Sequence, residues 1–296
     1  MTRPIAVVVN RGGGAASRAG DALVEQIEAA FKAAGATADI HAVDGKDLIT
    51  TIEHLAKTGV VAVGGGDGTQ GCAAAVLSKA GATHGILPLG TRNNLARQLG
   101  IPLDLEGAAK VIAGGHTTAI DLSEVNGHVF INNASIGLYP TQVELRDKAQ
   151  KRGLPKWLAK IPASWTVLKN LPHHRYRLQL DNAVQPVVTP LLFIGNNVYS
   201  LEPGKVGTRR AMDDGKLSVF AVAKNSRLGL ITLALRALVG RSNPDTDFAT
   251  IGDCERLIVS AHRSRLKVAL DGEVISLSTP LKFTVRPAAL KVFVPA

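Results

Sequence analysis

The feature that most constrains the fold is a glycine-rich stretch, residues 60–77, which reads VVAVGGGDGTQGCAAAVL. Its apolar start predicts a strand buried on both faces, and the small residues after Gly71 predict a helix. The glycines therefore lie on a turn from a strand to a helix. Backbone N–H groups are bare at the start of a helix, and glycine lets a phosphate approach them without a Cβ in the way. The stretch predicts a phosphate-binding turn in an α/β domain.

Two common phosphate motifs fit this stretch poorly. A Walker A loop would close with Lys-Ser or Lys-Thr, and no such pair follows the glycines. The spacing G-x-G-x-x-G is present, but no acidic residue that could bind a ribose occurs between Asp67 and Asp104. A bare carboxylate at Asp67 repels a phosphate unless a cation lies between them. The pattern therefore predicts a nucleotide bound together with Mg²⁺.

A second glycine turn follows in the segment GILPLGTRNNLARQLGIP. Pro88 and Gly90 end a predicted strand, and a helix is predicted to begin at Asn94. Thr91 and Asn93 lie where a hydroxyl and an amide can cap that helix or contact a phosphate. We interpret the two turns as two walls of one nucleotide site.

The chain separates into two kinds of pattern. Up to residue 122, apolar strands alternate with helical patterns, which predicts an α/β domain with a parallel sheet. Residues 123–296 show short strands bounded by turns, which predicts an antiparallel β-sandwich domain. A largely helical insert at about 141–171 interrupts it, and 228–239 predicts one further helix. The C-terminal segment can pack back on the first domain.

Composition argues against several classes of protein. The hydrophobic content of 46% disfavours disorder, and no apolar run is long enough to cross a bilayer. The N-terminus leads directly into a strand rather than a signal peptide, so we expect a cytoplasmic protein. The net charge is +10, but only 4% of the residues are aromatic and no nucleic-acid-binding motif occurs. We therefore expect no nucleic-acid partner.

Basic residues gather in the segment 146–177, together with Trp157 and Trp165. Basic residues beside Trp and Leu on short helices are suited to contact with an anionic membrane. A solvated helix packed on the core would show the same pattern. The segment therefore predicts either a peripheral contact with the inner face of the membrane or an ordinary surface helix.

Three motifs, GGGDGT, LPLGTRNNLAR and ALDGEV, occur in an order and spacing that resemble the diacylglycerol kinase catalytic-domain family, which includes bacterial soluble lipid kinases. The family is related to the sphingosine and ceramide kinases. Further matching segments are IDLSEVNG, FINNASIGLYP, FIGNNVY, RRAMDDGKLSVF and RPAALKVFVP. GGDGT alone is shared with phosphofructokinases and NAD kinases, whereas the combination is typical of the lipid kinases. The resemblance implies a phosphofructokinase-like (NAD-kinase-like) α/β domain, a β-sandwich domain, and transfer of the γ-phosphate of ATP to the hydroxyl of a membrane lipid.

The resemblance also implies roles for individual residues. The nucleotide-contacting positions match Asn10, Gly65, Gly66, Asp67, Gly68, Thr69 and Thr91, and Asn93 lies in the second turn. Asp67 would hold Mg²⁺, directly or through water. The family's proton acceptor matches Glu273, and Asp271 would orient it or share the field of the metal. Asp121 matches a further acid of the active site.

Two of these segments also have an ordinary structural interpretation. The Asp-Gly pair in ALDGEV is common in hairpin turns, and the one in AMDDGKL fits the corner of a β-turn. In bacterial members of the family, AMDDGKL corresponds to a second Mg²⁺ site. There Asp214 would supply a carboxylate, while Ala211 and Lys216 would supply backbone carbonyls.

Three positions depart from the family pattern. Arg11 stands in place of a proline, Gly71 in place of an asparagine, and Asn94 in place of an aspartate that would add a carboxylate to the Mg²⁺ shell. An active kinase is still predicted. The alternatives are a catalytically weak nucleotide- or lipid-binding regulator and a kinase of a soluble substrate, as NAD kinase is. The sequence leaves open which lipid is the acceptor (diacylglycerol, ceramide, a sphingoid base or phosphatidylglycerol) and whether the chain forms a homodimer.

Overall fold

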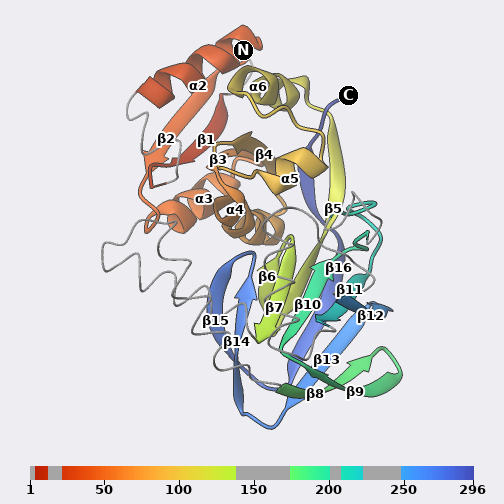
Figure 1. The fold of residues 1–296 in the computed structure, drawn as a ribbon. Helices are drawn as coiled ribbons and strands as arrows, with labels where there is room; N and C mark the ends of the chain where they lie inside the picture. Colours follow the sequence, from red (N-terminus) through yellow and green to blue (C-terminus); the bar gives the residue numbers. More distant parts are fainter. Residues whose placement is uncertain (1–3, 13–21, 138–173, 201–207, 223–247) are drawn as a thin grey trace. The chain divides into compact units, whose positions relative to one another are not determined.

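The computed structural model describes residues 4–12, 22–137, 174–200, 208–222 and 248–296 (Figure 1). The chain divides into two compact units, Met1–Leu122 with Pro287–Ala296, and Ser123–Arg286. Two strands, β5 (Thr117–Val125) and β16 (Leu281–Phe293), contribute residues to both units. Residues 287–296, which the sequence analysis placed in the second domain as a segment that can pack back on the first, belong to the first unit.

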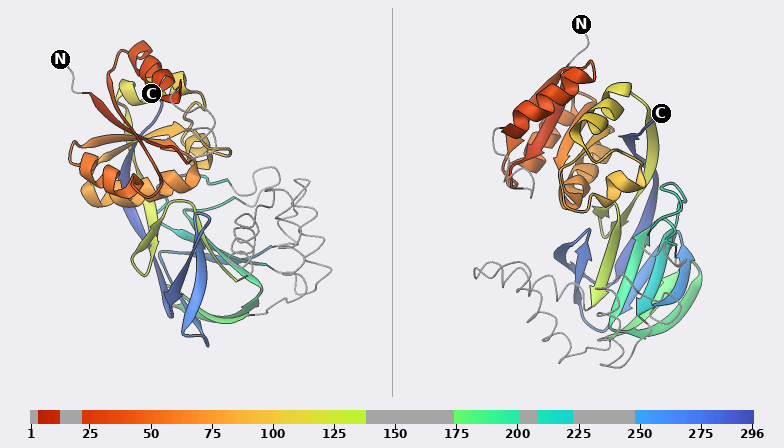
Figure 2. Two further views of the ribbon diagram at one scale, coloured as in Figure 1. Left: turned by 90° about the vertical axis from the view of Figure 1, so that its left-hand side faces the viewer. Right: turned by 45° about the horizontal axis from the view of Figure 1, so that its top comes forward.

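The first unit is a parallel sheet with helices on both faces (Figure 2). Its strands run in the order β2-β1-β3-β4, and the end of β16 pairs in parallel with β4. Helix α2 packs beside α6, and α3 packs beside α4. The bounds are β1 (Ile5–Asn10), α2 (Ala22–Ala33), β2 (Ala38–Val43), α3 (Leu48–Ala56), β3 (Val60–Gly65), α4 (Asp67–Ala80), β4 (Thr83–Pro88), α5 (Asn94–Gln98) and α6 (Leu105–Gly114).

The apolar pattern explains how this unit is packed. Val7 in β1 and Val63 in β3 are fully buried, as expected for strands covered on both faces. Helix α2 turns one side, with Ile27 and Phe31, into the core. The parallel α/β layer predicted from the sequence is therefore confirmed.

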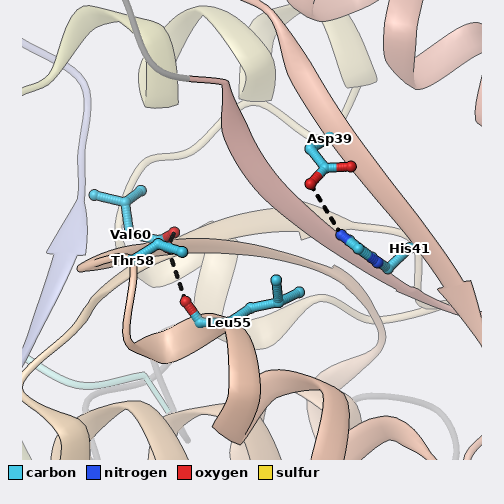
Figure 3. A network of polar contacts seen from close by, with 5 residues as sticks. All are labelled: Asp39, His41, Leu55, Thr58 and Val60. Carbon is cyan, nitrogen blue, oxygen red and sulfur yellow. Dashed lines mark hydrogen bonds and ion pairs between the residues drawn. The ribbon is translucent and has the colours of Figure 1, made fainter.

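Side-chain polar contacts stabilise a turn and an edge strand of this unit (Figure 3). The hydroxyl of Thr58 lies 2.8 Å from the Leu55 carbonyl oxygen and 3.0 Å from that of Val60, which closes the turn between α3 and β3. On the edge strand β2, Asp39 Oδ2 lies 3.2 Å from His41 Nε2. These two residues are two positions apart, so they share a face of the strand.

The second unit is a sandwich of two antiparallel sheets. One has the strand order β12-β11-β10-β7-β14-β15, and the other contains β16-β13-β8-β9 with β5 and β6. Their inner faces share one apolar core, which includes Leu178, Leu192, Val219 and Leu257. The bounds are β6 (His128–Phe130), β7 (Asn133–Gly137), β8 (His174–Leu180), β9 (Ala183–Thr189), β10 (Leu191–Asn196), β11 (Leu217–Val222), β12 (Phe248–Cys254), β13 (Arg256–Ala261), β14 (Arg265–Leu270) and β15 (Glu273–Ser278).

The predicted β-sandwich is confirmed, but some elements were not foreseen. Strand β9 contains Pro186, which weakens a strand pattern because proline cannot donate to a ladder. Helix α6 was overlooked although Asp104 caps it, accepting a hydrogen bond from the Gly107 N–H at 2.7 Å. The helices expected at 141–171 and 228–239, with both tryptophans, lie outside the described residues. No helix within the described ranges has the length and apolar character needed to span a bilayer.

His84 in β4 is an unusual member of the first core. Its side chain is fully buried, and neither ring nitrogen has a hydrogen-bond partner among the described residues. Burial lowers the pKa of His84 to about 3, so the ring is neutral in the folded protein at ordinary pH. The unfolded chain binds this proton near pH 6.5. The buried histidine therefore favours the folded state less as the solution becomes acidic.

We expect this unit to lose stability on mild acidification. The folded-state pKa of His84 lies below its unfolded value, so its full contribution to stability is present above pH 6.5 and is lost as the pH falls toward 3. Between about pH 7 and pH 5 this linkage amounts to roughly 2 kcal/mol. Urea unfolding followed by circular dichroism should show a correspondingly smaller drop in His84→Leu. Equal drops in the two proteins would contradict this assignment.

Candidate functional site

The glycine turn predicted to bind phosphate leads from β3 into α4. Helix α4 begins at Asp67, and its N-cap residue Gly66 is extended, with no side chain capping the helix. The N–H groups of Asp67, Gly68 and Thr69 therefore have no acceptor within the helix. An uncapped helix N-terminus favours an anionic ligand, because bare N–H donors and the helix dipole act together.

The glycines have a packing function as well. A Cβ added to Gly90 would overlap the Cα atom of Gly66, and one added to Gly65 would overlap the Thr69 side chain. The turn after β3 and the turn after β4 therefore touch through bare backbone. The structure thus brings together the two turns that the sequence analysis interpreted as walls of one site, both within the first unit.

Asn10, the last residue of β1, reaches the same turn. Its Nδ2 donates to Thr69 Oγ1 at 3.2 Å, while its Oδ1 accepts from the Gly12 N–H at 3.0 Å. Because Thr69 Oγ1 accepts this bond, its own proton can be donated to another acceptor, such as a phosphate oxygen. Asn10 therefore orients the Thr69 hydroxyl.

Asp67 links the two turns through a hydrogen bond. Its Oδ1 accepts a hydrogen bond from the Leu95 N–H in the first turn of α5 at 3.3 Å. No described residue donates to its Oδ2, which leaves that oxygen for a cation. Mg²⁺ at nucleotide sites commonly uses one or two carboxylates, with phosphate oxygens and water completing its shell. One open carboxylate oxygen beside an uncapped helix N-terminus fits a nucleotide with Mg²⁺.

Asn93 stabilises its own turn. Its backbone is left-handed, with φ 50°, and its Oδ1 accepts from the Gly90 N–H at 2.8 Å. Its Nδ2 donates to the carbonyls of Pro88 and Gly90 at 3.1 and 3.0 Å, so both amide protons are already used. Of the two alternatives given for Asn93, the cap on α5 does not form, because no side-chain cap bond is made there. A contact of Asn93 with a nucleotide stays a prediction. Thr91 is exposed, and its contact with a phosphate stays a prediction.

Sequence reasoning overlooked Gln70, which fixes the strand ends from which both turns start. Its buried Nε2 donates to the Val63 carbonyl at 2.9 Å and lies 3.4 Å from the Leu87 carbonyl. These contacts join the ends of β3 and β4. The only signal in the sequence was a polar residue among the small residues of the segment GTQGCAAA.

Asp121, expected to be an active-site acid, has a structural contact in the first unit. It is buried in β5, and its Oδ1 accepts from the Ala288 N–H at 2.8 Å. Ala288 has φ 49°, a conformation that costs energy for a residue other than glycine. Asp121 therefore holds an irregular point of β16 in place, and its catalytic role stays a prediction.

In the second unit, the segment ALDGEV forms the hairpin turn considered as a structural interpretation. Asp271 and Gly272 have φ 47° and 96°, and Leu270 pairs with Glu273 across the turn. Positive φ at both central residues is the signature of a type I′ turn. The Glu273 side chain is exposed at the first position of β15. Its position leaves the carboxylate accessible from solvent.

The carboxylate of Asp271, in contrast, points toward the loop before β7. It accepts hydrogen bonds from the N–H groups of residues 131–133, at 2.8 Å from Ile131, 2.8 Å from Asn132 and 3.1 Å from Asn133. Burial raises the pKa of Asp271, while these donors and Arg209 oppose the shift. Asp271 thus fixes the hairpin to the loop before β7, and its carboxylate oxygens bond to this loop rather than to Glu273.

Arg209 completes a polar network around this loop. Its Nη1 donates to the Ile131 carbonyl at 2.7 Å, and its Nη2 donates to Asn132 Oδ1 at 3.0 Å. Its guanidinium carbon lies 5.8 Å from the centre of the Tyr199 ring, and burial lowers the pKa of Arg209. The hydroxyl of Tyr199 donates to the Asn132 carbonyl at 3.0 Å. The network thus joins three family-like segments, FINNASIGLYP, FIGNNVY and RRAMDDGKLSVF.

The predicted second metal position, residues 211–216, lies just before β11. Asp214 Oδ2 accepts from the Val198 N–H at 3.3 Å, and the Lys216 carbonyl accepts from the Asn197 N–H at 2.8 Å. Burial raises the pKa of nearby Asp253, with Lys216 opposing the shift and Asp214 adding to it. Across the described ranges, no three His, Cys, Asp or Glu side chains are grouped to hold a metal ion. Metal binding by Asp214, Ala211 and Lys216 stays a prediction.

Each of the two parts of the chain matches a known protein family. Residues 4–125 match the family model of the diacylglycerol kinase catalytic domain, and residues 147–294 match that of the YegS C-terminal NAD kinase beta sandwich-like domain. A protein of Staphylococcus aureus strain JH9 that is named diacylglycerol kinase is 31% identical to this chain over 157 residues. The aligned residues cover 51% of this chain and 49% of that protein. Protein sll0036 of Synechocystis is 26% identical over 241 residues, or 78% of this chain and 54% of that protein. The chain therefore spans about half the length of these curated relatives.

Solved structures show the same fold. A crystal structure described as a diacylglycerol kinase from Bacillus anthracis strain Sterne aligns with a TM-score of 0.68 and 20% identity. The alignment covers 99% of this chain and 97% of that chain. A second structure from the same strain aligns with a TM-score of 0.71 and 23% identity over the same shares.

The two acids of the hairpin should differ sharply in their effect on stability. Asp271→Ala should lower the free energy of unfolding by about 3 kcal/mol or more, because it leaves buried N–H donors and Arg209 without their acceptor. Glu273→Gln, at an exposed position, should change it by less than about 0.5 kcal/mol. Urea unfolding of both variants measures the difference. Similar values for the two variants would show that Asp271 does not anchor the hairpin.

Proposed function

The chain belongs to the diacylglycerol kinase catalytic-domain family, and from this premise we propose that it transfers the γ-phosphate of ATP to the hydroxyl of a membrane lipid. The observation that carries the proposal is the contact between two glycine turns, with the Asp67 carboxylate joining them. Such a site suits a nucleotide whose phosphates are bound mainly by backbone N–H groups. The acceptor class is a lipid with a free hydroxyl, of which diacylglycerol is the first candidate.

Residues of the first unit bind and orient the nucleotide in this proposal. The N–H groups at the start of α4 bind phosphate oxygens, and the Thr69 hydroxyl, oriented by Asn10, donates to another. Asp67 would hold Mg²⁺ through its Oδ2, directly or through water. When bound, Mg²⁺ would neutralise the charge that develops on the transferred phosphoryl group. Asn94, exposed where the family has an aspartate, would make Asp67 the main carboxylate for the ion.

Glu273 is the proposed proton acceptor for the lipid hydroxyl. The hydroxyl oxygen forms a bond to the γ-phosphorus as the bond from that phosphorus to the ADP oxygen breaks, and the hydroxyl proton passes to the Glu273 carboxylate. Asp271 acts as a positioning residue, because its bonds to residues 131–133 fix the turn on which Glu273 lies. This division of roles follows from one half-buried acid whose oxygens are hydrogen-bonded to the protein and one exposed acid.

The direct test is phosphorylation of a panel of lipids. Purified protein is incubated with labelled ATP, Mg²⁺ and one acceptor at a time: NAD, or detergent-dispersed diacylglycerol, ceramide, sphingoid base or phosphatidylglycerol. Label in a lipid product supports the proposal and identifies the acceptor. Label in NAD alone would favour a kinase of a soluble substrate. Binding of ATP without turnover on any acceptor would favour a regulator.

Asp67→Asn should abolish most of the phosphoryl transfer while preserving the fold. The amide oxygen can still accept from the Leu95 N–H, but the negative charge that would hold Mg²⁺ is lost. We expect turnover below about a tenth of the wild-type value, equivalent to more than roughly 1.4 kcal/mol in the barrier, and weaker binding of Mg·ATP. Asp67→Ala, which also removes the acceptor for α5, should in addition cost about 1 kcal/mol of stability.

Glu273→Gln should lower turnover by about two to four orders of magnitude, because a carboxylate that accepts the proton is replaced by an amide that cannot. The affinity for ATP, measured by calorimetry, should be unchanged within about twofold. If ATP affinity collapses and turnover at saturation survives, Glu273 belongs to the nucleotide site instead.

A further inference from the structure

The hairpin of β8 and β9 has an outer face of unusual composition. Strand β9 ends the sheet order β16-β13-β8-β9, so it is an edge strand, as Figure 1 shows. Directly opposite residues are Arg175 and Val188, Arg177 and Pro186, and Gln179 and Val184. The residues between them on β8, Tyr176, Leu178 and Leu180, are buried in the sandwich core. We name Arg175, Arg177, Val184, Pro186 and Val188 the hairpin face.

The hairpin face exposes apolar side chains to an unusual degree. Val184 is 50% exposed and Val188 is 48% exposed. Among the described residues, the only other large hydrophobic side chains with comparable exposure are Ile49 and Leu103. Strand β9 thus has two exposed valines, and each lies opposite a polar residue of β8. This arrangement suits a partner that has a polar outer layer over an apolar interior.

The charges on the hairpin face are positive, and within the described part of the chain they have no ion-pair partner. No described residue forms a side-chain hydrogen bond or ion pair with Arg175 or Arg177. The neighbouring strands continue the positive charge, because Arg256 of β13 and Lys282 of β16 are exposed and form no ion pair with another described residue.

The nearest carboxylates in the sequence of these strands do not neutralise this face. Asp181, at the hairpin tip, accepts hydrogen bonds from the N–H groups of Glu255 and Arg256. Glu255 itself lies before the first residue of β13, beyond the paired region of the hairpin. The face therefore presents cations without matching anions of its own.

Taken together, we propose that the hairpin face docks on the anionic surface of a lipid bilayer. The arginines contact the phosphate headgroups, and Val184 and Val188 enter the boundary between headgroups and acyl chains. The inference rests on the proposed function only in that a lipid acceptor requires a membrane. The contact itself is a binding property, independent of phosphoryl transfer.

Two other occupants fit the hairpin face less well. A second copy of the chain could extend the sheet by pairing with β9, but Pro186 lacks an N–H donor, and proline on an edge strand opposes such pairing. A nucleic acid would satisfy the arginines, but it offers nothing apolar to the two valines, and no aromatic side chain is exposed there for base stacking. A bilayer satisfies both kinds of side chain.

The test is co-sedimentation of the full chain with vesicles of equal parts phosphatidylglycerol and phosphatidylcholine. The double variant Arg175→Gln, Arg177→Gln should need about 30-fold more lipid for half-maximal binding at low salt, with a weaker dependence on salt. The double variant Val184→Thr, Val188→Thr keeps β-branched side chains and should bind more weakly while keeping the wild-type salt dependence. The matched control Lys32→Gln, Lys110→Gln removes the same charge from exposed positions on α2 and α6 and should bind nearly as the wild type does.

Several results would overturn the proposal. These are absence of wild-type binding to anionic vesicles, equal binding to pure phosphatidylcholine, or an equal loss in the control variant. A change from dimer to monomer in the valine variant, measured by analytical ultracentrifugation, would assign the hairpin face to a second copy. Tighter binding of single-stranded RNA than of vesicles would assign it to nucleic acid. Failure to phosphorylate any detergent-dispersed lipid would overturn the proposed kinase function, whereas vesicle binding would still be measured separately.

Discussion

The first unit is organised by a backbone contact that only glycine permits. The turns after β3 and β4 meet where the Cα of Gly66 occupies the space that a Cβ of residue 90 would need. Other contacts rely on this approach, because Asp67 reaches the Leu95 N–H across it and Gln70 extends toward the ends of both strands. A methyl group at position 90 would therefore separate two turns and weaken several polar contacts at once. Packing of the turns favours glycine here, and the proposed binding of a phosphate would favour it as well, so the two requirements agree.

The second unit depends in a comparable way on two half-buried charges. Asp271 and Arg209 approach the loop at residues 131–133 with opposite charges, one accepting from its N–H groups and the other donating to its carbonyl and side-chain oxygens. Each backbone group of this loop would be costly to bury without a partner. The network therefore fixes the conformation of an irregular loop, as ladder hydrogen bonds fix that of a strand. An exposed acid such as Glu273 can be placed accurately only on a turn that is held in this manner.

The sequence was most informative where the relevant physics is local. Alternation of strands and helices, and the Asp-Gly hairpin, are set by neighbouring residues, and the predicted domain types were confirmed. Partners far apart in the sequence were not predictable. Asp271 bonds to residues near position 132, and Asp121 bonds to Ala288, and no spacing rule connects such positions. For Asn93 the sequence left open a helix cap or a phosphate contact, and it did not reveal the left-handed backbone that turns the amide back toward its own loop.

The path of β16 has a consequence for how the chain acquires its structure. Its last part, including Val292 beside His84 of β4, supplies a strand to the first unit, although nearly all the rest of that unit precedes residue 123. On a ribosome, the N-terminal residues would emerge long before their final strand. Until that strand arrives, one edge of the parallel sheet lacks its neighbour and has open N–H and C=O groups. Completion of the first unit is thus coupled to synthesis of residues 287–296, which gives its folding a late step.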